Sequence, residues 1–306
     1  MRKRKEPKLS SNNMCAVVVT YDPDIRLRER IEKIRDQVDK LLIVDNNSAP
    51  DCVEMIQKIS INLDVNVIEN SSNVGIAEAL NQGLKYFKAL DSKYSWVLTL
   101  DQDSSCYSSL VQQLIMAYEE CPFRDEVGII GTNYQEKTTG HILHKKKKAN
   151  ESWEEVQNLP TSGCITSLAA FSEVGDFRSD FFIDHVDTEY CMRLRNKGYR
   201  VLISPKVGMI HPLGYYRASK LHKLLRGSSM ITNYPPFRHY YWTRNGLILI
   251  WENLRRDTNW SLNQVYYLFF RRTITILLFE DKKLIKIGNI CLGVWHALIS
   301  RRGIKK

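Results

Sequence analysis

Hydrophobic and polar positions follow two alternating periods over the first hundred residues. Short runs rich in apolar and β-branched residues, typical of buried strands, occupy 15–21, 41–45, 64–70 and 95–100. Between them, apolar residues recur at helical spacing over about 25–38, 52–59 and 74–90. Because strands and helices alternate in this way, the pattern predicts an α/β fold, a mostly parallel sheet with helices on both faces.

In a second block, from about 127 to 211, hydrophobic and polar positions alternate less regularly. Its segments predict strands, helices and one polar loop, and they occupy 127–134, 144–155, 161–175 and 181–205. The loop is the lysine-rich segment 144–155. Gly198 follows a helical pattern and precedes a strand-like run, so we expect it to end that helix.

The composition is typical of a globular chain and indicates its cellular location. The 306 residues are 43% hydrophobic, which is enough to bury a sizeable core. The seven cysteines are scattered and form no CxxC pair, which argues against a disulfide framework and a zinc site. The basic segment 1–13 runs into an apolar stretch too short for a signal peptide. These features predict a reducing, cytoplasmic location.

Positive charge is concentrated in the C-terminal third. Residues 211–306 contain 17 Lys and Arg against 4 Asp and Glu, whereas residues 1–210 contain 27 against 30. The same third holds 15 of the 31 aromatic residues, yet no apolar run there reaches the ~18 residues of a membrane span. This composition predicts a surface that lies against anionic lipid. A helical subdomain with an exposed basic face fits it too, whereas no motif supports nucleic-acid binding.

Aspartates follow three of the predicted parallel strands. Asp22 follows the first strand, Asp45 the second, and Asp101 with Asp103 the fourth. Ligands of such sheets bind outside the carboxyl ends of the strands, so these carboxylates are expected at one edge. Two aspartates one residue apart can share Mg²⁺ or Mn²⁺, and the cation in turn can hold a diphosphate. Taken alone, the same spacing also fits a solvated turn.

Several other polar residues have more than one interpretation. Asp45 either caps the next helix or accepts hydrogen bonds from a nucleobase or ribose. Asn73 and Gly75 stand at a helix entry, where free backbone N–H groups suit an anion, although no glycine-rich phosphate loop is present. His211 is either a third metal ligand or an ordinary surface or core histidine.

A second acidic cluster combines Asp184, Asp187 and Glu189 directly after apolar residues. Negative charge is favourable at a helix start, so a solvated first turn explains the cluster. Alternatively, partial burial raises the pKa of one carboxylate, which then accepts a proton from an attacking hydroxyl as a general base.

Six motifs, in this order, resemble the family 2 inverting glycosyltransferases with the GT-A fold, and among them the bacterial rhamnosyltransferase-like branch. They are VVVTYDPD (17–24), LLIVDNNS (41–48), NVGIAEALNQG (73–83), WVLTLDQDS (96–104), FFIDHVDTEYCMRLRNKGYRV (181–201) and MIHPLG (209–214). The resemblance implies three regions: a basic tail at 1–13, a GT-A domain at 14–214, and a helical, basic and aromatic region at 215–306 that faces a membrane.

The resemblance also implies roles for individual residues. Nucleotide contacts are implied for Thr20, Tyr21, Asp22, Asp45, Asn73, Gly75 and Asp101. Asp101 and Asp103 form the D-x-D of the family, which meets the ribose and the metal ion, Mg²⁺ or Mn²⁺. His211 falls where some members place an additional metal ligand.

Asp187 aligns with the aspartate of the Glu-Asp motif, which is the catalytic base of the family. Val186 stands where that motif has its glutamate, which keeps Asp184 as an alternative base. Cys191 and Arg193 match the C-x-R that follows the base, and this favours Asp187.

The implied activity is transfer of a sugar from a nucleotide-diphosphate donor, with inversion at the anomeric carbon. The branch suggests dTDP-L-rhamnose as donor and, as acceptor, a polysaccharide such as O-antigen or capsule growing on an undecaprenyl-diphosphate lipid. The enzyme would then bind peripherally to the inner face of the cell membrane. A UDP-hexose is the alternative donor. Two other functions are less consistent with the sequence. A nucleotidyltransferase would be expected to have a glycine-rich basic loop after the first strand, and 20–30 has no such loop. A non-catalytic partner protein would be expected to have lost the aspartates, which are present.

Overall fold

The computed structural model describes residues 9–144, 151–212, 214, 216–219, 222–224 and 230–305. The chain forms two compact units: the first contains Met1–Ser179 and Asp187–Pro212, and the second contains Asp180–Val186 and Leu213–Lys306. Most of the expected basic tail, the centre of the expected polar loop and Leu213 of the last motif lie outside the described residues.

One large sheet forms the centre of the first unit, with strand order β3-β2-β1-β4-β8-β6-β9-β5 and β7 paired to β9. The predicted parallel strands are confirmed as β1 (Met14–Thr20), β2 (Lys40–Asp45), β3 (Asn66–Glu69) and β4 (Trp96–Asp101). All seven residues of β1 are buried, because helices cover this part of the sheet.

The other half of the sheet is mixed. Its strands are β5 (Ser105–Cys106), β6 (Val127–Glu136), β7 (Glu154–Glu155), β8 (Cys164–Ser167) and β9 (Arg200–His211). β8 runs antiparallel to both β4 and β6, whereas β6 and β9 are parallel. β9 extends beyond the segment 181–205 and includes the strand-like run 207–210 that precedes His211. The strand continues through Pro205 to His211 because the pairing with β6 shifts register there.

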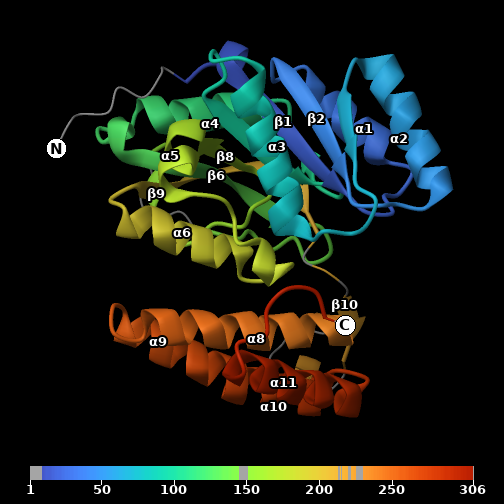
Figure 1. Ribbon diagram of the computed structural model, residues 1–306, viewed down its shortest axis with the longest axis vertical. Helices are drawn as coiled ribbons and strands as arrows, with labels where there is room; N and C mark the ends of the chain where they lie inside the picture. Colours follow the sequence, from blue (N-terminus) through green and yellow to red (C-terminus); the bar gives the residue numbers. More distant parts are fainter. Residues whose placement is uncertain are drawn as a thin grey trace. The chain divides into compact units, whose positions relative to one another are not determined.

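Helices surround this sheet (Figure 1). They are α1 (Leu27–Arg35), α2 (Pro50–Leu63), α3 (Ile76–Leu90), α4 (Leu110–Glu119), α5 (Leu168–Val174) and α6 (Val186–Asn196), with 3-10 turns η1 (Ser11–Asn13), η2 (Arg124–Glu126) and η3 (Ser179–Phe181). α3 packs on β1, β2 and β4, whereas α4 packs on β6 and β9. Gly198 has φ +82° just after α6, as expected of a glycine that ends a helix.

The second unit is mainly helical. It contains β10 (Tyr216–Ala218), β11 (Met230–Thr232), α8 (Pro236–Asn253), α9 (Thr258–Val265), the π-helical segment η4 (Tyr266–Arg271), α10 (Arg272–Phe279) and α11 (Lys283–Leu298). α8 packs closely on α11, where a Cβ at Gly293 would lie 2.7 Å from the Tyr240 carbonyl oxygen. Among the described residues, no helix combines the length and apolar character needed to cross a bilayer.

Charged side chains are buried inside this helical unit. Glu280 accepts a hydrogen bond from Lys286 at 2.7 Å and pairs with Arg272 at 3.0 Å. His239 lies 3.7 Å from the same carboxylate. Burial, together with the nearby Arg272 and Lys286 charges, lowers the pKa of His239 to about 3. Buried charges are tolerated only when they are paired, so this cluster ties α8, α10 and α11 together.

Candidate active site

The ends of β1, β2 and β4 lie side by side at one edge of the sheet. Thr20 is in register with Asp45, and Val19 is in register with Asp101. The loops that carry the sequence-predicted aspartates therefore meet at this edge, because parallel strands end together.

The structure brings Asp101, Asp103 and His211 together. One ligand atom from each lies within 4.8 Å of the others. His211 Nδ1 is 3.5 Å from Asp103 Oδ1, and its Nε2 is 3.9 Å from Asp101 Oδ2. The pairing of β5 with β9 explains the approach, since Ser105 is in register with Ile210, directly before His211.

The three side chains fit a divalent cation. Asp103 is half-exposed as a residue, but its Oδ1 atom is buried and makes no hydrogen bond within the described part of the chain. A buried carboxylate oxygen without a hydrogen-bond donor is costly unless a cation satisfies it. Two carboxylates suit both Mg²⁺ and Mn²⁺, and the imidazole ligand favours Mn²⁺ over Mg²⁺.

Two serines orient this cluster. The Ser104 hydroxyl lies 2.9 Å from His211 Nδ1 and 2.7 Å from the Ser162 hydroxyl. Ser162 Oγ also accepts the backbone N–H of Asp101 at 3.0 Å. When Nδ1–H donates to Ser104, the Nε2 lone pair of His211 is available to a metal, an arrangement typical of metal-ligating histidines.

The middle residue of the D-x-D fixes the loop after β4 to the loop after β1. Gln102 accepts the backbone N–H of Tyr21 at 2.6 Å and donates to its carbonyl at 3.0 Å. The buried Arg30 donates to the Gln102 carbonyl at 2.9 Å and pairs with Asp24 at 2.8 Å. Hydrogen bonds from Arg30, and then from Arg26, lower the pKa of Asp24 to about 2.

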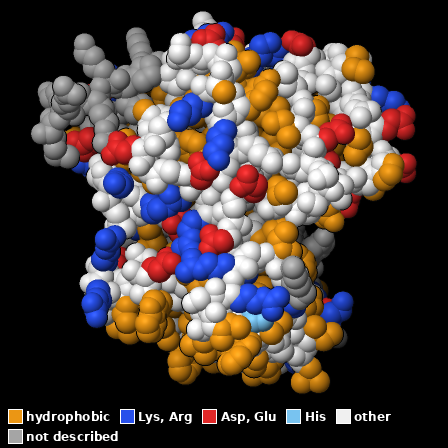
Figure 2. Space-filling view, in the orientation of Figure 1, with side chains coloured by type: hydrophobic (Ala, Val, Ile, Leu, Met, Phe, Trp, Pro, Cys, Tyr) orange, Lys and Arg blue, Asp and Glu red, His pale blue; other side chains and the backbone are white. Residues whose placement is uncertain are grey.

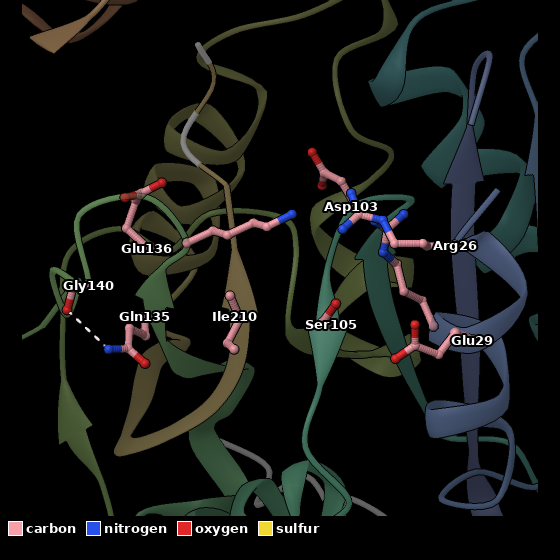
Figure 3. A pocket seen from close by; sticks show the side chains of 10 residues that line it. Arg26, Glu29, Asp103, Ser105, Gln135, Glu136, Gly140 and Ile210 are labelled. Atoms are coloured by element: carbon pink, nitrogen blue, oxygen red, sulfur yellow. Dashed lines mark hydrogen bonds between the residues drawn. The ribbon is translucent and has the colours of Figure 1, made fainter. Parts of the chain in front are cut away.

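A cavity of about 300 Å³ opens beside Asp103 (Figure 3). Its walls include Arg26 directly before α1, Glu29 and Arg30 of α1, Ser105 of β5, and Gln135, Glu136 and Lys137 around the end of β6. The two glutamates have partners of their own: Glu29 pairs with Lys33 at 2.6 Å, and Glu136 accepts the N–H of Thr138 at 2.8 Å. The cavity therefore offers room beside the candidate metal ligands, with basic side chains along its walls.

Asp45 is buried, and its carboxylate accepts hydrogen bonds from the end of β1 and from the loop after β2. Its carboxylate accepts hydrogen bonds from the Thr20 hydroxyl at 2.7 Å and from the hydroxyl and N–H of Ser48 at 2.6 and 2.9 Å. The capping interpretation is wrong, because α2 begins after Ala49 without a side-chain cap. Asp22 accepts the N–H of Ala49 at 2.7 Å and so joins the loops after β1 and β2. Contact of Asp45 with a nucleobase stays a prediction.

The entry of α3 lies next to the same loops. Asn73 Oδ1 accepts the N–H of Gly75 at 3.0 Å, and Gly75 adopts φ +86° at the N-cap of the helix. Asn46 donates to the Gly75 carbonyl at 3.3 Å. Asn73 and Gly75 thus shape a helix start beside the end of β2, as the sequence predicts.

The three carboxylates near α6 have different surroundings. Asp184 binds Arg238 through both carboxylate oxygens. Glu189 is buried and pairs with Arg193 at 2.6 Å. Asp187 lies in the first turn of α6, half-buried, where its Oδ1 accepts the N–H of Thr188 at 2.7 Å. Asp184 and Glu189 thus have arginine partners, and Asp187, at the start of α6, is the candidate base that the resemblance to the family implies.

The backbone directly before Asp187 is strained. Phe182, Asp184 and His185 have φ values of +62°, +65° and +62°. Residues other than glycine rarely adopt such angles, and each costs about 1–3 kcal/mol unless the surroundings impose it.

Buried polar side chains of α8 hold this strained segment. Asn245 Nδ2 donates to the carbonyls of Phe181, Ile183 and Asp184, at 2.9, 2.9 and 3.0 Å. The neighbouring Arg244 donates to the Asp180 carbonyl at 2.9 Å. Both side chains are fully buried. The segment Asp180–Val186 is therefore part of the second unit, although Asp187 follows it in sequence.

The sequence comparison decides the family. Residues 15–175, more than half of the chain, match the family described as glycosyl transferase family 2. The chain belongs to glycosyl transferase family 2. This glycosyltransferase is also 27% identical to the dTDP-rhamnosyl transferase RfbF of Shigella flexneri over 285 residues, which is 89% of this chain and 91% of that protein.

Solved structures similar to this glycosyltransferase confirm its GT-A fold. S. aureus TarS 1–349 in complex with UDP superposes with a TM-score of 0.58 and 14% identity, covering 94% of this chain and 83% of that chain. GalNAc-T7 with UDP, GalNAc and Mn²⁺ superposes with a TM-score of 0.57 and 12% identity, covering 94% of this chain and 56% of that chain.

Several residues around the site of this glycosyltransferase carried no local sequence signal. Gln102 and Arg30 act across loops that are far apart in the chain. Arg244 and Asn245 did leave a trace, since two adjacent polar residues interrupt the apolar and aromatic pattern of 240–251. Buried polar groups need hydrogen-bond partners, so polar residues within an apolar helix indicate that the helix makes specific hydrogen bonds to another segment.

Proposed function

We propose that this glycosyltransferase moves L-rhamnose from dTDP-L-rhamnose to an acceptor hydroxyl with inversion at the anomeric carbon. The observation that carries the chemistry is the cluster of Asp101, Asp103 and His211 at the edge where three strands end. The similarity to RfbF along nearly the whole chain supports the choice of donor.

In this proposal the loops after β1, β2 and β4, with the entry of α3, bind the nucleotide. Thr20, Tyr21, Asp22 and Asp45 shape the base side, Asn73 and Gly75 lie against the nucleotide, and Asp101 approaches the ribose. Asp103 and His211, together with Asp101, hold Mn²⁺ or Mg²⁺, which when bound neutralises charge on the leaving diphosphate. UDP in the TarS structure, and UDP with Mn²⁺ in GalNAc-T7, support this arrangement.

Asp187 is proposed as the general base. Its carboxylate accepts the proton of the acceptor hydroxyl as the oxygen attacks the anomeric carbon from the face opposite the diphosphate. The new carbon–oxygen bond forms while the bond to the diphosphate breaks, so the configuration inverts. The proton stays on Asp187, and the nucleotide diphosphate leaves with the bonding electron pair.

The proposed acceptor is a polysaccharide, such as O-antigen or capsule, growing on an undecaprenyl-diphosphate lipid. The region 215–306, which follows the GT-A domain at 14–214 in the sequence, would then lie on the inner, anionic face of the cell membrane. The basic and aromatic composition of that region supports this location.

A UDP-hexose is the second candidate donor, because TarS, which shares the fold, binds UDP. A donor panel separates the two. Purified full-length protein with Mn²⁺ is given dTDP-L-rhamnose, UDP-glucose, UDP-galactose or UDP-N-acetylglucosamine, and nucleotide release and thermal shift are measured. We expect a selective response to dTDP-L-rhamnose. A selective response to one UDP-hexose would overturn the donor assignment and leave the family unchanged.

A further inference from the structure

The second unit contains a cavity of its own, about 360 Å³ in volume, between β11, η4 and α10. One part of its lining is apolar and includes Ile274 and Leu278. The other part is polar and includes Arg271, Tyr267 and Thr232. A lining divided in this way suits a ligand that has an anionic end and a hydrocarbon end.

Arg271 is the cation available to such a ligand. Its guanidinium lies over the Tyr267 ring, 5.2 Å from the centroid, and it forms no ion pair with any carboxylate that the structure describes. The adjacent Arg272 differs, because it is buried and paired with Glu280 at 3.0 Å. A guanidinium presents its donors in a planar fork that matches phosphate oxygens, which makes Arg271 a suitable phosphate ligand.

The helix geometry places the polar side chains at the cavity. Tyr266 and Arg271 are the ends of the π-helical segment η4, and both line the cavity. In an α-helix, residues five positions apart point about 140° away from each other. The wider π turn, with hydrogen bonds from i to i+5, brings them back to one side. Such turns are rare and are frequently found at functional sites, which favours a functional role for this segment.

Apolar side chains continue from the cavity onto the surface. Phe270, Ile274 and Leu278 are 59%, 53% and 47% exposed, and Ile274 and Leu278 are also cavity residues. Figure 2 shows hydrophobic side chains gathered over the helices of this unit. Exposed apolar groups next to a cationic pocket are typical of surfaces that enter the interfacial layer of a membrane.

We propose that this cavity binds the phosphate group of a long-chain lipid. Arg271 pairs with the phosphate, Thr232 and Tyr267 supply further hydroxyl donors, and the hydrocarbon chain lies along Ile274 and Leu278. A face used only for contact between two copies of the chain would need no unpaired arginine inside a cavity. The inference concerns the second unit alone and does not depend on the donor sugar.

Vesicle binding by the full-length protein tests the proposal. Vesicles of an uncharged galactolipid, which has no phosphate, carry equal mole fractions of phosphatidylglycerol, a phosphorylated isoprenoid or oleate, so that phosphate and carboxylate charge are compared directly. We expect tighter sedimentation with either phosphate-bearing lipid than with oleate. The stronger of the two arms identifies the source of the phosphate. Competition by inorganic phosphate measures how much the headgroup contributes without the chain.

Matched variants locate the binding. Arg271→Gln is expected to weaken binding to the phosphate-bearing vesicles about tenfold, whereas Arg255→Gln, an exposed arginine outside the cavity, leaves it within twofold. Leu278→Asn and Leu284→Asn form the apolar pair, since only Leu278 lines the cavity. Thermal unfolding confirms that each variant folds.

Equal losses in Arg271→Gln and Arg255→Gln would reduce the effect to general surface charge and overturn the proposal. Equal losses in the two leucine variants would contradict the cavity in the same way. The proposal is also wrong if no vesicle is bound while Leu278→Asn abolishes a dimer seen by ultracentrifugation, because the face would then join two copies of the chain.

Discussion

At the scale of single residues, the chemistry depends on which carboxylates are already neutralised. Asp184 and Glu189 have arginine partners, and Asp45 is enclosed by hydroxyl and N–H donors. Asp103 instead has a buried oxygen that no hydrogen bond satisfies among the described residues. Asp187 lies half-buried at a helix start. The buried oxygen of Asp103 supports its proposed role as a metal ligand, and the place of Asp187 at the start of α6 fits its proposed role as the base.

Replacing Asp187 by Asn removes the proton acceptor and keeps the size of the side chain. A general base contributes about 10²–10⁴ in rate, so kcat for sugar transfer should fall at least 100-fold with little change in donor binding. Asp184→Asn is the control, and it should lower thermal stability while keeping kcat within about tenfold. Steady-state kinetics of both variants check this. Full turnover by Asp187→Asn with intact folding would show that the base is another residue.

At the scale of elements, α8 determines the backbone that leads into α6. Three positive φ angles in four residues are held by the hydrogen bonds of Asn245 and Arg244. The backbone that leads into the candidate base is therefore set by a helix that is more than fifty residues away in sequence. The same helix contributes His239 to the buried cluster around Glu280, so α8 serves both the loop and the stability of the second unit.

Asn245→Ala removes the three hydrogen bonds that Nδ2 donates to carbonyls and the one that Oδ1 accepts from Arg244 at 2.9 Å. At about 1 kcal/mol each, the loss should lower the free energy of unfolding by about 3–4 kcal/mol. Because the loop precedes Asp187, kcat should fall while KM for the donor stays nearly constant. Asn253→Ala is the matched control, since Asn253 donates only to Leu249 within α8. A loss of stability without any loss of kcat would limit Asn245 to a structural role.

The buried His239 makes stability depend on pH. Its pKa of about 3 in the folded protein lies below the usual value of 6.5, so the unfolded chain binds the extra proton between these values. Stability from this group is therefore complete above pH 6.5 and is lost progressively as the pH falls towards 3. Urea unfolding at pH 7, 6 and 5 should show a smaller loss of stability for His239→Gln than for the wild type. Parallel pH profiles would contradict the assignment.

At the scale of the whole molecule, the parallel half of the sheet was predictable and the mixed half was not. β1, β2 and β4 consist of continuous apolar runs because both of their faces are covered. β5 and β7 have two residues each, too few for any periodic pattern. The direction of β8 depends on partners that are distant in sequence, and the passage of β9 through Pro205 depends on a register shift.

The site followed the same division. Asp101 and Asp103 were predictable because they follow a strand end, and the resemblance to the family added His211 and Asp187. Gln102 was not, and the polar residues 244 and 245 indicated only that buried partners were needed, since the partners belong to segments that only folding brings together. Local pattern and the family resemblance thus indicated the candidate groups for the chemistry, whereas the contacts that hold their loops are seen only in the tertiary structure.

We propose that Asp101, Asp103 and His211 form a metal-dependent donor site. The most direct test of this proposal is the rate of nucleotide release from the donor selected by the panel, measured with Mn²⁺, with excess chelator, and after Mn²⁺ is restored. We predict that turnover disappears in chelator and returns with Mn²⁺, and that Asp103→Asn needs a much higher Mn²⁺ concentration. Full turnover in excess chelator would contradict the account.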